Sequence, residues 1–120
     1  LIKESKLLLA QRSEQMSHPL MWEFPGGKLH KGESPEKCIK REIMEELHVR
    51  IEVEQLLPSV IHNYGSKTVK LIPFICSLVS DEIRLVQHRA YTWVSKNEVT
   101  DYDILPPDLE VIKNINREWE

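Results

Sequence analysis

The chain has 120 residues, of which 41% are hydrophobic and 29% charged, and it carries a net charge of −3 at pH 7. These values are those of one globular domain over residues 1–120, and they argue against a protein that coats nucleic acid or a membrane surface. No apolar run is long enough to span a membrane and no signal peptide is evident. Cys38 and Cys76 lack the spacing of a zinc site, so buried thiols in a reducing cytoplasm are expected.

The first quarter of the chain predicts two strands and a glycine turn. Lys6–Gln11 is apolar enough for a strand that ends at Arg12, and a polar loop follows as far as Pro19. Met21–Phe24 predicts a short strand that enters the turn at Gly26-Gly27. Two glycines in succession allow the backbone to come close to a ligand.

A helix is predicted to begin after Ser34. Serine is a good N-cap, the following proline suits the first helical turn, and apolar residues recur every fourth position at Ile39, Ile43 and Leu47. This stripe is expected to be buried, which leaves the other faces of the helix to solvent or to a substrate.

Three glutamates stand on that outer side of the helix. Glu42, Glu45 and Glu46 occupy positions i, i+3 and i+4, so their carboxylates share one face. Such a cluster opposes helix formation unless a cation sits among the charges, and a set of oxygen ligands favours Mg²⁺ or Mn²⁺. A solvated acidic surface is the alternative, and the glycine turn, Glu33 and Arg41 at fixed spacings favour the metal site.

The second half of the chain predicts three more strands and a final helix. The strand candidates are 51–61, 68–78 and 91–94, with a hairpin loop at 63–66, a turn at 80–82 and a short helical turn after a capping box at Ser95 and Glu98. A last helix is expected to begin at Pro106, with an apolar face made of Leu109, Ile112, Ile115 and Trp119.

The segment 27–49 resembles the signature box of the Nudix hydrolases, Gly-x5-Glu-x7-Arg-Glu-U-x-Glu-Glu-x-Gly-U, where U is aliphatic. It matches at every position except His48, which replaces the second glycine. Residues 7–12, 22–27, 93–94 and 105–108 are similar to landmarks of the MutT-like branch. The resemblance implies the Nudix α/β/α fold, an α+β arrangement in which a mixed β-sheet is sandwiched between helices.

The resemblance also assigns roles in the box. It implies that Glu42, Glu45 and Glu46 bind the metal with the backbone carbonyl of Gly26, and that Glu42 helps to activate water. Arg41 is expected to pair with Glu33 and so to lock the loop onto the helix.

Two departures from the family pattern bear on the site. Histidine tolerates a positive φ better than most residues, so His48 is expected to end the helix at a cost of about 1 kcal/mol. Gln87 lies where many relatives carry a further catalytic glutamate, and glutamine cannot take a proton. Water activation would then depend more on Glu42, or on His88, although a loop histidine is more often a surface residue.

Substrate contacts are expected outside the metal cluster. By position in the family, Arg12 matches a phosphate-contacting arginine, Lys67 a base-contacting arginine and Asp108 a base-reading residue that could instead be an N-cap. Lys28 and Phe24, beside the glycine turn, are further substrate-binding candidates. Trp22, Tyr64 and Phe74 are aromatic residues that could stack on a base or belong to the core.

The resemblance to the MutT-like branch implies, as the leading interpretation, Mg²⁺-dependent hydrolysis of (deoxy)nucleoside triphosphates to monophosphate and pyrophosphate, as in nucleotide-pool cleaning. With an aspartate at position 108, the chain resembles the CTP/5-methyl-dCTP pyrophosphohydrolases, which implies a substrate such as CTP, dCTP or 5-methyl-dCTP, with 8-oxo-dGTP as a competitor. Hydrolysis of another diphosphate, such as a dinucleotide polyphosphate or a nucleotide sugar, is the second interpretation, and a non-catalytic sensor is the third. The partner is a small nucleotide, with no nucleic acid and no membrane, and the protein could be a monomer or a homodimer.

Overall fold

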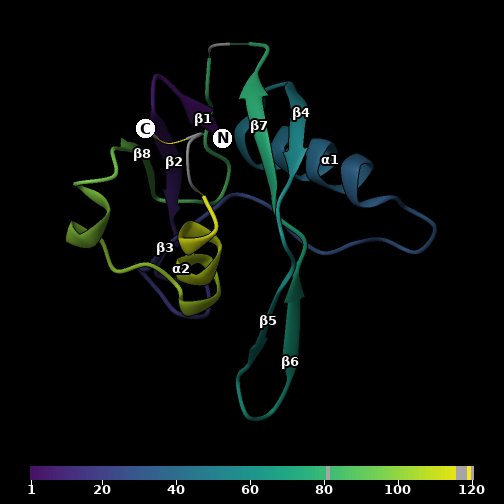
Figure 1. The fold of residues 1–120 in the computed structure, drawn as a ribbon, viewed down its shortest axis with the longest axis vertical. Helices are drawn as coiled ribbons and strands as arrows, with labels where there is room; N and C mark the ends of the chain where they lie inside the picture. Colours follow the sequence, from purple (N-terminus) through teal and green to yellow (C-terminus); the bar gives the residue numbers. More distant parts are fainter. Residues whose placement is uncertain (81, 116–118, 120) are drawn as a thin grey trace.

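The computed structural model describes residues 1–80, 82–115 and 119. Within them lie eight strands, two α-helices and one 3₁₀ helix (Figure 1). The strands are β1 (Ile2–Lys3), β2 (Lys6–Gln11), β3 (Trp22–Glu23), β4 (Ile51–Leu56), β5 (Val60–Asn63), β6 (Thr68–Leu71), β7 (Phe74–Leu78) and β8 (Ala90–Val94). The helices are α1 (Pro35–Leu47), the 3₁₀ helix Val99–Asp101 and α2 (Pro106–Lys113).

Strand β2 is the centre of the fold. It pairs antiparallel with β1 near its start, with β3 near its end and with β8 along most of its length. Leu7 and Leu9 point into one hydrophobic core and Leu8 into another, and each is no more than 1% exposed. Because successive residues of a strand face opposite sides, a strand buried in this way must be covered on both faces.

The two cores correspond to the two helices. The core around Leu8 includes Ile43 and Leu47 of α1, whereas the core around Leu7 and Leu9 includes Val111 of α2. This arrangement confirms the predicted α+β fold with a sheet between helices. The paired strands are antiparallel, and the parallel component is a single bridge between Trp22 and Ile104.

Helix α1 begins and ends where the sequence predicts. The Ser34 hydroxyl accepts a hydrogen bond from the Lys37 N–H, and Pro35 occupies the first helical position. His48 ends the helix in the left-handed conformation with φ 55°, and its N–H donates to the carbonyl of Met44. His48 therefore adopts the left-handed conformation that is expected of the glycine at this position of the family box.

The strand predictions for 51–61 and 68–78 are each wrong in one respect, because each segment forms two strands. The breaks fall next to Pro58 and Pro73, and a proline has no N–H to give to a sheet. Strands β4 and β7 pair beside α1, whereas β5 and β6 form a hairpin that extends away from the rest of the molecule (Figure 1). The predicted hairpin loop at 63–66 is confirmed by the turn bond from Tyr64 N–H to the Lys67 carbonyl.

The C-terminal helix differs from its prediction in two ways. It ends at Lys113, before Ile115 and Trp119, although both of these side chains are buried. Leu109 is 42% exposed, and the polar Asp108 is buried in its place. The predicted turn at 80–82 includes Asp81, which lies outside the described residues. None of the described helices combines the length and apolarity needed to cross a membrane.

Candidate active site

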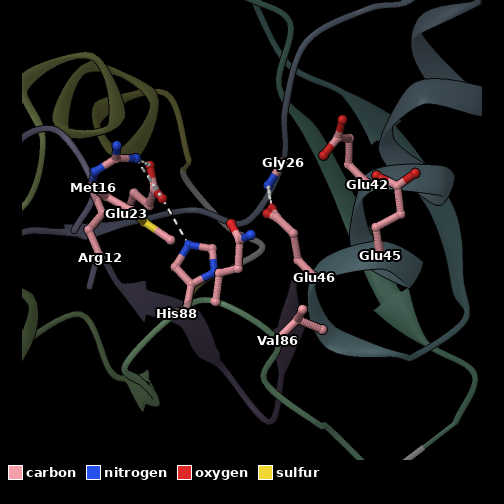
Figure 2. Close-up of a pocket in the computed structure, with 10 residues that line it drawn as sticks. Arg12, Met16, Glu23, Gly26, Glu42, Glu45, Glu46, Val86 and His88 are labelled. Atoms are coloured by element: carbon pink, nitrogen blue, oxygen red, sulfur yellow. Dashed lines mark hydrogen bonds and ion pairs between the residues drawn. The ribbon is translucent and has the colours of Figure 1, made fainter. Parts of the chain in front are cut away.

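A cavity of about 390 Å³ lies between α1 and the end of β2. One wall carries Glu42, Glu45 and Glu46 of α1, and the facing wall carries Arg12, Glu23 and His88 (Figure 2). The remaining lining residues are Met16, Gly26, Val86 and Gln87. The structure thus brings the three predicted acidic residues of the box, Gly26 and Arg12 into one cavity.

Glu46 ties the helix to the glycine turn. Its Oε1 accepts a hydrogen bond from the Gly26 N–H at 3.0 Å. Burial raises the pKa of Glu46 to about 7, against the lowering effects of that bond and of His88, and the negative charges of Glu23 and Glu42 add to the rise. A carboxylate in this position would gain from a bound cation.

Arg41 makes the predicted pair with Glu33. Its Nε and Nη2 donate to the two oxygens of Glu33 at 2.7 and 3.0 Å, and Nη2 also donates to the Lys28 carbonyl. These contacts hold the pKa of Glu33 at about 2, through the Arg41 hydrogen bond first and then the His30 N–H. The loop between the glycine turn and α1 is thereby fastened to the helix.

Arg41 also reaches the candidate metal ligands. Its Nη1 donates to Glu42 at 2.8 Å and to Glu45 at 3.1 Å. One guanidinium therefore neutralises carboxylates that would repel each other along the helix. Arg41 therefore has a second role, the neutralisation of Glu42 and Glu45, in addition to the predicted pairing with Glu33.

Gly27 lies directly against Glu42. A Cβ atom added at position 27 would overlap the carboxyl group of Glu42. A side chain at position 27 would therefore displace the Glu42 carboxyl group from its present position.

The wall opposite the box is a hydrogen-bonded group of three side chains from distant parts of the chain. Arg12 Nη1 donates to both oxygens of Glu23, at 2.9 and 3.0 Å, and Ser17 holds the same guanidinium through its carbonyl and its hydroxyl. His88 Nε2 lies 2.9 Å from Glu23 Oε2. Glu23 therefore joins Arg12 to His88.

Sequence reasoning did not single out Glu23 and favoured a surface position for His88. The side chain of His88 is only 5% exposed, so the expectation that a loop histidine lies on the surface is wrong here. A charged residue between the aromatic Trp22 and Phe24, on a strand that enters the glycine turn, was the available signal for Glu23.

The other predicted substrate residues do not line this cavity. Lys28 contributes its backbone carbonyl to Arg41, and Lys67 is exposed in the β5–β6 loop. Phe24 packs beside the core around Leu7, and its N–H donates to Asp108 Oδ2 at 3.1 Å. The substrate roles of these four residues stay predictions.

Asp108 is not an N-cap, because Leu105 holds that position and Asp108 is the third residue of α2. Burial raises its pKa to about 7, and the charge of Glu23 adds to this effect. The Asp108 charge in turn helps to raise the pKa of Tyr64, after burial of the phenol. Asp108 and Tyr64 are therefore electrostatic neighbours beside the β5–β6 hairpin.

The donor set of the cavity suits a hard divalent cation. Three carboxylates and a backbone turn offer only oxygen ligands, and the buried Glu46 would be relieved of its unfavourable environment. As the side chains of the described residues are placed, however, no three acidic, histidine or cysteine groups converge enough to hold an ion. A cation would have to compete with Arg41 for Glu42 and Glu45.

Comparison with known proteins places this geometry in a family. The family model for the NUDIX domain matches residues 1–115. The chain is 28% identical to the CTP pyrophosphohydrolase of Escherichia coli (strain K12) over 111 residues, which are 92% of this chain and 82% of that protein. It is 32% identical to the 8-oxo-dGTP diphosphatase of Proteus vulgaris over 81 residues, which are 68% of this chain and 72% of that protein.

A solved structure agrees with these sequence matches. The solution structure of the mismatch repair protein MutT from methicillin-resistant Staphylococcus aureus 252, a Nudix hydrolase, aligns with a TM-score of 0.73 and 37% identity. The alignment covers 93% of this chain and 86% of that one. With the box helix, the glycine turn and the fold in agreement, the chain belongs to the Nudix family and is an enzyme that acts on phosphorus-containing anhydrides.

Proposed function

We propose that this protein hydrolyses (deoxy)nucleoside triphosphates to the monophosphate and pyrophosphate, with Mg²⁺ or Mn²⁺ as cofactor. The observation that carries the proposal is the position of Glu42, Glu45 and Glu46 on one wall of a single cavity, with Gly26 beside them. The names of the relatives, a CTP pyrophosphohydrolase and an 8-oxo-dGTP diphosphatase, support a triphosphate substrate.

The chemistry needs a cation, because the cavity is too negative to receive a polyphosphate. Glu23, Glu42, Glu45 and Glu46 all line it, whereas its one lining cation among the described residues, Arg12, is paired with Glu23. A divalent ion bound by Glu42, Glu45 and Glu46 would supply charge neutralisation and polarise the phosphoryl group. Gly26 fixes Glu46 through its N–H, whereas Arg41 holds Glu42 and Glu45, so the ion would have to replace the Arg41 guanidinium at the oxygens it now contacts.

Arg12 is the residue of the opposite wall best placed to meet a phosphate. Its guanidinium is held from two sides, by Glu23 and by Ser17, and its side chain is 18% exposed. A preorganised arginine loses little further freedom when it binds an anion. We expect Arg12 to position the phosphate chain between the walls.

A nucleotide panel with Mg²⁺ tests the reaction, with pyrophosphate and orthophosphate measured separately. Pyrophosphate and a nucleoside monophosphate are the expected products, and Glu42→Gln should lower kcat by at least about 100-fold. Direct release of orthophosphate would rule out pyrophosphohydrolysis. Turnover of dinucleotide polyphosphates or nucleotide sugars in preference to triphosphates would favour the second interpretation, and no turnover of any diphosphate compound would favour a sensor.

The substrate base is proposed to lie near Asp108, with CTP, dCTP or 5-methyl-dCTP preferred and 8-oxo-dGTP as a competing substrate. Asp108 neighbours the backbone of Phe24 and the ring of Tyr64, which together offer a polar edge and an aromatic surface. The test is Asp108→Asn, with kcat/KM compared for dCTP, 5-methyl-dCTP and 8-oxo-dGTP. Equal preferences in the variant and the natural protein would exclude a base-reading role for Asp108.

A further inference from the structure

His88 is a buried side chain with an unmet hydrogen-bonding group. Its Nε2 is bound to Glu23, but its Nδ1 has no partner among the described residues and is covered from bulk solvent. A buried polar atom without a partner is energetically unfavourable, so such atoms are rare and need an explanation. The explanation available here is a partner that comes with the substrate, because His88 lines the cavity.

The neighbours of His88 determine which nitrogen carries the proton. Glu23 accepts two contacts from the Arg12 guanidinium, so it is a carboxylate and an acceptor. The nitrogen that faces it, Nε2, must therefore be the N–H donor. In the neutral ring, Nδ1 is then left with a lone pair, as in histidines that a carboxylate orients for proton transfer.

The position of His88 is fixed by the fold as well as by Glu23. The next residue, Arg89, donates its N–H to the carbonyl of Gln11 at the end of β2. In Figure 2 the His88 ring stands between Glu23 and Glu46. His88 thus belongs to the part of the cavity wall that faces the box helix.

The other lining residues are poorly suited to accept a proton. Glu42 and Glu45 are engaged by Arg41, Glu46 by the Gly26 N–H, and all three would be ligands of the cation. Gln87 has no basic group. Arg12, Met16, Gly26 and Val86 complete the lining with Glu23, which already serves Arg12 and His88.

We propose that His88 is the proton acceptor for the attacking water, with Glu23 as its positioning residue. The inference rests on the proposed pyrophosphohydrolase function. In the step, water oxygen forms a bond to phosphorus while one water proton passes to Nδ1. The attacked atom is the β-phosphorus, as the resemblance to MutT-like enzymes implies. Its bond to the oxygen shared with the α-phosphorus breaks, the electron pair leaves with the nucleoside monophosphate, and the water oxygen ends in pyrophosphate. Glu23 stabilises the imidazolium, which then returns its proton to solvent.

His88→Gln is the sharpest variant. The glutamine amide can reach the position of Nε2 and keep the hydrogen bond to Glu23, but it offers no base at the position of Nδ1. We expect kcat to fall by about 100-fold or more, the range of general-base catalysis, with KM changed less than about threefold. The exposed His30 provides the matched control, and His30→Gln should leave both constants unchanged.

A second experiment separates proton transfer from a structural role. His88→Ala is assayed with a series of added substituted imidazoles, and the rescued rate should increase with the basicity of the imidazole. Rescue that is independent of basicity would overturn the proposal, as would His88→Gln with kcat within about twofold of the natural protein. In either case the natural protein would still release pyrophosphate, whereas a failure of the proposed function would appear as no pyrophosphate release from any variant.

Discussion

Asp108→Asn should change how the stability of the protein depends on pH. The ordinary pKa of the group is 3.8, and burial raises it to about 7 in the folded chain. Between these values the folded protein keeps a proton that the unfolded chain has released. The free energy of unfolding contributed by Asp108 is therefore fully present below about pH 4 and is lost as the pH rises through about 7.

The size of this effect follows from the shift. Each pKa unit corresponds to about 1.4 kcal/mol, so a shift of about three units gives up to about 4 kcal/mol. For a chain of this length, 1 kcal/mol changes Tm by about 4 °C. Asparagine is neutral at every pH and its carbonyl can accept the Phe24 N–H. We expect the Tm of Asp108→Asn, relative to the natural protein, to rise by up to about 15 °C between pH 4 and pH 8.

Thermal unfolding followed by circular dichroism at half-unit pH intervals measures this difference. Subtracting the curve of the natural protein removes the contribution of Glu46, which titrates in a similar range. Asp103→Asn, at an exposed aspartate nearby, is the matched control and should follow the natural protein. A difference between Asp108→Asn and the natural protein that stays constant across this pH range would refute the reasoning.

Three further substitutions test the box. Gly27→Ala should lower kcat by at least about 10-fold, because its Cβ would displace the Glu42 carboxyl group. Steady-state kinetics measure this loss, and circular dichroism should show that the variant still folds. An unchanged kcat would contradict the close approach of Gly27 to Glu42. His48→Gly should stabilise the protein by about 1 kcal/mol in denaturant titration with unchanged kcat, since glycine adopts the left-handed conformation without strain; a loss of stability would show that the histidine ring contributes packing. Arg41→Lys should reduce both Tm and kcat, because lysine cannot bind both oxygens of Glu33 and still reach Glu42, and wild-type values of both would count against the shared guanidinium.

Helix α1 was predictable because its signals are local. Ser34 and Pro35 start the helix, and His48 ends it in the left-handed conformation expected of the glycine at this position of the box. The pair of Arg41 and Glu33 was accessible too, since their spacing belongs to the box. Local rules therefore specified well the cavity wall that carries Glu42, Glu45 and Glu46.

The contact between Glu23 and His88 on the opposite wall could not be predicted from local sequence signals. Glu23 and His88 are 65 residues apart, and they meet only because β3 and β8 both pair with the end of β2. The periodicity of the sequence does not predict such a contact between distant residues. The burial of Asp108 also depends on tertiary packing, which outweighed the helix-face pattern that favoured Leu109.

The position of β2 has a consequence for how the protein is made. The strand leaves the ribosome well before β8, with which it makes its longest pairing and which lies about 80 residues later in the chain. Closing so long a loop is slow. Until it closes, the consecutive leucines of β2, which face the two sides of the sheet in turn, are not fully buried on either side. A nascent or truncated chain that stops before Val86 thus exposes a strongly apolar strand and lacks Val86, Gln87 and His88 of the candidate active-site cavity. The enzyme should become active, and safe from aggregation, at the same late moment of synthesis.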